Sequence, residues 1–150
     1  MGNFVANISK GRFVHYCTMP ETNDGIIVVP LEATGIVADD ALKDYDTLDA
    51  LLTGATNEQT TMGRKTISGA SVTVTVDDTN NRVDVDAPDQ TWTGATGNAI
   101  SDVVFCYDPD TTGGADTAII PMTYHDFALT PDGSDVVLQV AAAGFGRAQD

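Results

Sequence analysis

The chain has 150 residues, the length of one domain. Its 22 acidic and seven basic residues give a formal net charge of −15 at pH 7, well beyond the magnitude of about 2 to 8 that suits a small domain. A negative field of this size repels nucleic-acid phosphates and anionic lipid head groups, which argues against binding to nucleic acid or to a membrane surface. It favours a basic or mixed partner surface, or it serves solubility alone.

No segment predicts a secretory signal or a membrane span. The first residues lack an apolar stretch of the signal type, and the longest apolar run, Ile26–Leu31, is far shorter than the roughly 20 residues of a spanning helix. Cys17 and Cys106 stand far apart and in no Cys/His cluster of the zinc type. We therefore expect two reduced, buried thiols.

Residues 1–20 are predicted to form an N-terminal arm, as a short strand or a helical turn, that carries Lys10 and Arg12. Such an arm reaches onto a neighbouring molecule or packs against its own body through its aromatic side chains. The run Ile26–Leu31 predicts a buried strand, with Pro30 at a sheet edge or at the end of the strand.

One short helix is predicted over residues 46–53. The apolar residues of this region recur at helical spacing and form one stripe: Leu42, Tyr45, Leu48 and Leu52. Asp46 is the expected N-cap, and Gly54 is the expected stop.

The stretch Ser71–Trp92 predicts a β-hairpin around which the rest of the chain is arranged. Valines alternate with threonines in its first half and with aspartates in its second half, around the polar turn DDTNN. A period of two puts the valines on one face and the polar side chains on the other. The rest of the chain must then supply a second layer that covers the valines.

Further strands are predicted at short intervals over residues 64–68, 91–93, 99–107, 117–123 and 134–143, with residues 99–107 as a central strand and residues 124–129 as an optional continuation of the strand over 117–123. This pattern predicts a mainly β protein, an antiparallel β-sandwich or jelly-roll-like barrel that carries one short helix.

A calcium site is a weak candidate in the acidic loop between two of these strands. Asp108, Asp110, Thr112 and Asp116 occupy positions 1, 3, 5 and 9 of an EF-hand-like series. Position 12 is Ile119 instead of a glutamate, so an acidic hairpin turn is the better interpretation.

Other chemistry has little support in the sequence. Cys106, His125 and Asp126 supply the residue types of a thiol nucleophile, a base and an orienting group, but the neighbours of Cys106 are typical of a core strand. Trp92 is expected to be a packing anchor rather than a sugar-stacking platform. No catalytic motif and no cofactor fingerprint occurs, so we predict neither an enzyme nor a bound cofactor.

Six stretches of the chain, in this order, are similar to a known family. They read ANISKGRFVHY, GIIVVPLEA, DYDTLDALL, RKTISGASVTVTVDDTNNRVDVDAPDQTW, VVFCYDPDTTGGADTAIIPMTYHDF and TPDGSDVVLQ. Over residues 5–147 the chain resembles the small structural proteins that tailed bacteriophages encode beside the major capsid gene. These are described as minor capsid, decoration or cement proteins.

The resemblance implies a non-enzymatic virion protein that is assembled in the host cytoplasm. Residues 21–150 would be a single β-rich decoration domain that binds the major capsid protein on the outer capsid surface and ties capsomers together. We expect a homo-oligomer, with a trimer favoured, because capsid surfaces offer three-fold and six-fold positions. The alternatives are a tail or other virion subunit, or a calcium- or carbohydrate-binding β-module.

The few cations are the candidates for partner contacts. On an acidic body, a rare basic side chain is expected to face a partner. The residues concerned are Lys10, Arg12, Arg64 and Lys65.

Overall fold

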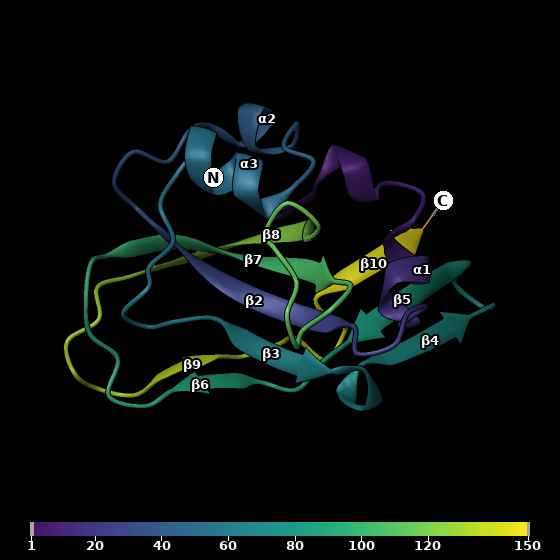
Figure 1. Ribbon diagram of the computed structural model, residues 1–150. Coiled ribbons are helices and arrows are strands. Elements are labelled where there is room, and N and C mark those ends of the chain that lie inside the picture. The colour runs from purple at the N-terminus through teal and green to yellow at the C-terminus, as the bar shows by residue number, and fades with distance from the viewer. Residues whose placement is uncertain (1, 150) are drawn as a thin grey trace.

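The computed structural model describes residues 2–149 and is mainly β, as predicted (Figure 1). The strands in this range are β1 (Phe4–Val5), β2 (Gly25–Glu32), β3 (Lys65–Ser68), β4 (Thr73–Asp77), β5 (Arg82–Asp86), β6 (Gln90–Trp92), β7 (Ile100–Asp108), β8 (Ile120–Leu129), β9 (Val136–Leu138) and β10 (Gly146–Gln149). The helices are α1 (Phe13–Cys17), α2 (Asp39–Leu42) and α3 (Leu48–Gly54), with 3-10 turns η1 (Asn7–Ser9) and η2 (Gly69–Ser71).

A five-stranded antiparallel sheet in the order β1-β8-β7-β2-β3 forms the centre of the molecule. The side chains of residues 26–29, 31 and 103–107 are at most 4% exposed, and Pro30 is buried between them. Their two strands are unbroken apolar runs because both faces of the sheet are covered. The prediction that residues 99–107 form a central strand is confirmed.

Each face of this sheet carries its own hydrophobic cluster, so the fold is β-sandwich-like, with α2 and α3 added on one side and α1 on the other. Leu42, Leu48 and Leu51 from α2 and α3 cover one face. Trp92 on β6 and Leu138 on β9 help to cover the other. Figure 1 shows α2 and α3 on one side of the sheet and β6 with β9 on the other.

The prediction of a single helix was wrong, because the described chain has three short ones. Helix α3 corresponds to the predicted helix, but Thr47 caps it instead of Asp46: the Thr47 hydroxyl accepts a 3.2 Å hydrogen bond from Ala50 N. Gly54 lies inside the last turn, where a Cβ would come within 3.1 Å of the Tyr45 ring. Helices α1 and α2 have five and four residues, too few for a helical period to be visible in sequence.

The described part of the predicted arm, residues 2–20, packs against the body. Strand β1 pairs with β8, and Ala6 N donates a 2.8 Å hydrogen bond to Met122 O. Helix α1 buries Phe13, Tyr16 and Cys17 in the hydrophobic cluster that contains Trp92 and Leu138. Of the two predicted roles of the arm, packing against its own body through aromatic side chains is the one that the structure shows.

Pro30 was expected at an edge or a strand end, but it lies inside β2 and pairs with Val103. Its carbonyl accepts a 2.9 Å hydrogen bond from Gln59 N. Strand β3 pairs with β2 only as far as Val28 and does not run alongside Pro30. The N–H that proline lacks is therefore not needed for a strand pair on that side.

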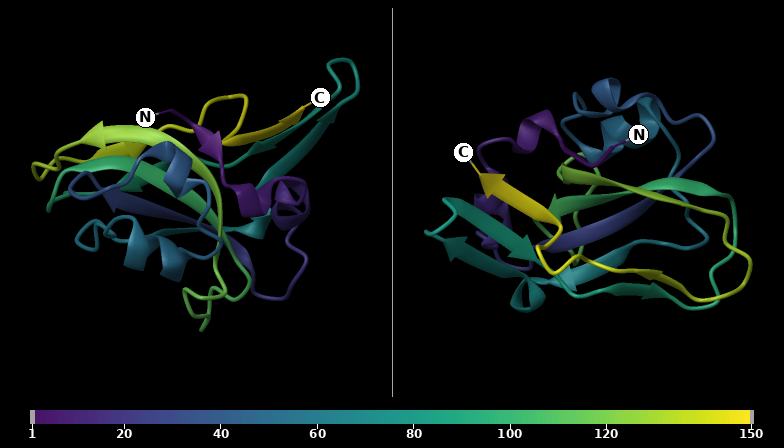
Figure 2. Two further views of the ribbon diagram at one scale, coloured as in Figure 1. Left: turned by 90° about the horizontal axis from the view of Figure 1, so that it is seen from above. Right: turned by 180° about the vertical axis from the view of Figure 1, so that it is seen from behind.

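A second antiparallel sheet, in the order β10-β5-β4, projects from the body (Figure 2). We call these three strands and the turn Asp78–Asn81 the wing. The predicted hairpin is confirmed as β4 and β5, and Asn81 in its turn has a left-handed φ of 50°. Strand β10 was not predicted, since it has no alternating apolar residues.

The predicted cover over the valines exists only at the base of the wing. Val85 is fully buried there and Val74 is half-buried. Val76, near the turn, is 66% exposed.

Candidate functional site

The wing has one apolar and one charged face. The register puts Val76, Val83 and Ala148 in one row across the three strands, on the same face as Val74 and Val85. This row lies at the end of the wing away from the body and lines a shallow hollow of about 450 Å³. We call it the outer apolar row.

The opposite face of the wing is held together by ion pairs. Asp84 on β5 accepts from Arg147 Nε at 2.5 Å and pairs with Arg82 Nε at 3.0 Å. Arg82 also pairs with Asp77 at 3.2 Å. Two of the seven cations are therefore used to stabilise the wing itself.

Arg64, a predicted partner contact, forms a clamp within the body. Its guanidinium donates to both oxygens of Glu58 at 2.9 and 2.7 Å and to both oxygens of Asp116 at 2.6 and 2.8 Å. The Arg64 side chain is 28% exposed, and these paired hydrogen bonds hold the pKa of the Asp116 carboxyl below its usual range. The clamp ties the segment before β3 to the loop before β8.

Lys65 and Trp92 lie together on the sandwich. The Lys65 ammonium sits 5.5 Å from the Trp92 ring centroid. Trp92 is 2% exposed, and its Nε1 donates a 2.8 Å hydrogen bond to Gly63 O. It is a packing anchor, as predicted, with no ring face open for a sugar.

Lys10 and Arg12 are the predicted contacts that stay accessible. Both are exposed, in the turn between η1 and α1. Lys10 Nζ donates to Asn7 Oδ1 at 2.8 Å, and the Arg12 guanidinium has no hydrogen-bond or ion-pair partner in the described part of the chain. They remain candidates for a partner surface.

The calcium candidate loop is built as an acidic turn. Asp108 Oδ1 accepts from Asp110 N at 3.0 Å, and Asp110 Oδ1 accepts from the backbone and hydroxyl of Thr112 at 3.1 and 2.5 Å. Asp116 is occupied by the Arg64 clamp. Over residues 2–149, no group of three or more His, Cys, Asp or Glu side chains is placed to hold a metal ion.

Cys106 and His125 lie on opposite faces of the central sheet. Cys106 is fully buried in the cluster under α3, and burial raises the pKa of its thiol. His125 packs edge-on against Phe105 on the other face, at 5.3 Å between ring centroids. Thiol catalysis would require the Cys106 thiol and the His125 imidazole to meet. They cannot meet here, because successive side chains of a strand point to opposite faces of the sheet.

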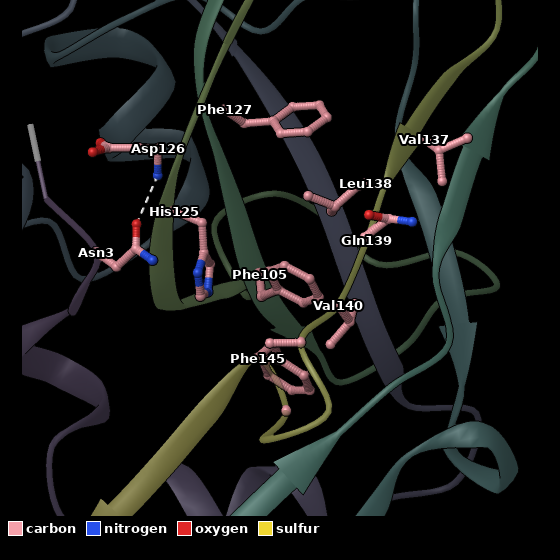
Figure 3. Close-up of a pocket in the computed structure, with 12 residues that line it drawn as sticks. Asn3, Phe105, His125, Asp126, Phe127, Val137, Leu138, Gln139, Val140 and Phe145 are labelled. Atoms are coloured by element: carbon pink, nitrogen blue, oxygen red, sulfur yellow. Dashed lines mark hydrogen bonds between the residues drawn. The ribbon is translucent and has the colours of Figure 1, made fainter.

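A pocket of about 370 Å³ opens between β8 and the segment that follows β9 (Figure 3). Phe105, Phe127 and Phe145 give it apolar walls, and His125 and Gln139 are among its polar groups. Burial lowers the pKa of His125, which favours the neutral form of the ring. Sequence reasoning missed this pocket because strands distant in the chain form it.

Asp102 and Asp108, both on β7, are the buried acidic residues of the described chain, and Asp108 accepts a hydrogen bond from Asp110 N, whereas Asp102 has no such partner. The environment of Asp102 is therefore unusual. It is fully buried, and neither carboxylate oxygen has a hydrogen-bond partner within residues 2–149. Burial is the main cause that raises the pKa of this carboxyl, with smaller contributions from the charges of Asp126 and Asp39.

No protein-family model matches the chain, and the searches of curated proteins and of solved structures found no significant match either. Among the described helices, none has the length and apolar character to cross a membrane.

The clamp yields a stability prediction. Arg64→Met keeps the apolar stem but leaves two carboxylates without their donor, so we expect the free energy of unfolding at pH 7 to fall by about 2 kcal/mol. Because Asp116 has a lowered pKa in the folded protein, its contribution is present at neutral pH and is lost as pH falls through that pKa.

Denaturant unfolding at pH 7 and at about pH 3 measures both effects. The matched control Arg12→Met, at an exposed site, should change stability by less than about 0.5 kcal/mol. Equal losses in the two variants would show that the clamp contributes nothing.

Asp102 yields a prediction of opposite sign. A carboxyl whose pKa is raised by folding destabilises the protein progressively as pH rises above its ordinary value of about 3.9. Asp102→Asn should therefore raise the melting temperature at pH 7, and the gain should vanish near pH 3. Asp78→Asn, at an exposed turn position, is the control for the change in net charge. A lower melting temperature for Asp102→Asn at pH 7 would contradict the assignment.

Proposed function

We propose that this protein is a structural component of a tailed-bacteriophage virion that binds the outer capsid surface and stabilises contacts between capsomers. The partner is the major capsid protein. The sequence resemblance over residues 5–147 supports this proposal. The position on the outside of a particle assembled in the host cytoplasm follows from the same resemblance.

The wing is the observation that carries the proposal. It projects (Figure 2) from a body whose sheet is covered on both faces, and its outer apolar row includes Val76, which is largely exposed. Val76 and Val137 are the large apolar side chains exposed on the described surface, and Val76 is the more exposed of the two, at 66% against 46%. An apolar row on a projecting element fits a site of contact with a larger surface.

The net charge of the protein also supports a large protein surface as its partner. With a net charge of −15, the protein attracts a basic or mixed surface. Lys10 and Arg12 are exposed and available to acidic groups on that surface. A small contact area per copy suffices when an oligomer engages several capsomers at once, because the later contacts form at high effective concentration.

Sedimentation with isolated phage particles tests the proposal. The protein should sediment with capsids and stay in the supernatant with isolated tails. If it sediments with tails alone, it is a tail subunit and the proposal is wrong.

A pair of valine variants tests the role of the wing. Val76→Ser removes apolar surface from the outer row and should reduce capsid binding about tenfold, equivalent to about 1.4 kcal/mol. Val137→Ser makes the same change on β9 and should leave binding unchanged. Ala148→Asp, on β10 in the same row as Val76, should also weaken binding. Equal binding by all three variants would remove the wing from the contact.

A further inference from the structure

Strand β4 is an unprotected sheet edge. It is the last strand in the order β10-β5-β4, so within residues 2–149 no strand bonds to its outer side. Proteins usually guard such edges with charged side chains, proline or a bulge, and β4 has one charged residue, Asp77, at its end. Strand β4 reads TVTVD, and its register with β5 runs without a shift from Thr73 to Asp77.

The sequence of this edge is complementary to itself. In an antiparallel pair of two β4 strands centred on Thr75, each Val74 lies opposite Val76 of the second copy. Each Thr73 then lies opposite Asp77, so no carboxylate faces another. All five residues of the strand take part.

Other registers fit less well. A shift by one residue would place valines opposite threonines and join the apolar face of one wing to the charged face of the other. A shift toward the turn, centred on Val76, would bring Asp78 opposite Val74. The register centred on Thr75 matches like faces, keeps the acidic side chains apart and pairs the whole of β4. A register centred on Val74 would also match like faces, but it would pair only residues 73–75 within the strand.

We propose that two copies of this chain pair through β4 into a two-fold dimer with a six-stranded wing sheet. The order would be β10-β5-β4 in one copy, followed by β4-β5-β10 in the other. Figure 2 shows the hairpin of β4 and β5 extending beyond the body. The outer apolar rows of both copies then lie on the same side of one sheet.

The dimer is weak and depends on salt. A contact of one five-residue strand is small by the standard of stable interfaces. Two bodies of charge −15 also repel each other at low ionic strength, so added salt strengthens the pairing. The pairing rests on the β4 edge alone and does not depend on capsid binding.

Cysteine cross-linking tests the register. Thr75→Cys places two thiols opposite each other at the two-fold axis, within the Cα separation of about 4.4 to 6.8 Å that a disulfide needs. In Thr73→Cys, the matched control on the same strand face, the thiols stand four residues apart, about 13 Å, and cannot be bridged. The native Cys17 and Cys106 are buried and do not compete.

Under mild oxidation at about 0.2 M salt, which screens repulsion beyond about 8 Å, Thr75→Cys should form a covalent dimer at least tenfold faster than Thr73→Cys. Equal rates, no cross-link in either variant, or a faster reaction of Thr73→Cys would overturn the proposal. Circular dichroism of the reduced variants checks that both remain folded.

Sedimentation velocity of the unmodified chain gives an independent test. The weight-average mass should rise with concentration from monomer toward dimer, and more steeply at high salt. A chain that stays monomeric at all concentrations, or one that forms the trimer expected from the sequence without a dimer, would contradict pairing through β4.

Discussion

Burial of β2 and β7 on both faces is the constraint on which the rest of the structure depends. Two adjacent strands with apolar side chains on both sides require two separate covers from a chain of 150 residues. Helices α2 and α3 supply one cover, and α1, β6, β9 and the base of the wing supply the other. Phe145, just before β10, stacks on Phe105 at 4.5 Å and meets Phe13 edge-on at 6.0 Å, so the wing is anchored in the core by its base. Its outer end extends past the edge of the body, where no cover remains.

The few cations are mostly used within the fold, and this determines which charges remain on the surface. Four of the seven cations form ion pairs inside the described structure, at Lys43, Arg64, Arg82 and Arg147. Most of the acidic side chains are left at least partly facing solvent, which favours a basic or mixed partner surface and opposes association of copies at low ionic strength. Asp102 departs from this pattern, since it lies buried on the central strand β7 without a partner among residues 2–149. We expect it to lower stability at neutral pH, because burying a carboxylate without a partner is costly.

Features that depend on local pattern were predictable from the sequence, and features that depend on distant contacts were not. The valine alternation predicted β4 and β5, and the apolar runs predicted β2 and β7. Strand β10 was missed because it forms through contacts with distant residues rather than through a local pattern. Gly146, for example, lies opposite Val85 and beside the Phe13 ring. The sequence also suggested Arg64 as a partner contact, but its two acceptors stand 6 and 52 positions away, and no local signal reveals them. The resemblance to phage decoration proteins stays a prediction.

In this account, a rigid, doubly covered body presents a wing that makes the contact with a larger shell. Amide hydrogen exchange, measured with and without isolated capsids, tests this claim most directly. The account predicts slow exchange in β2 and β7 under both conditions, because these strands are buried on both faces. It predicts that capsids slow the exchange of amides at the outer ends of β4, β5 and β10. Exchange that slows only at the opposite end of the body, or in no part of the protein, would contradict it.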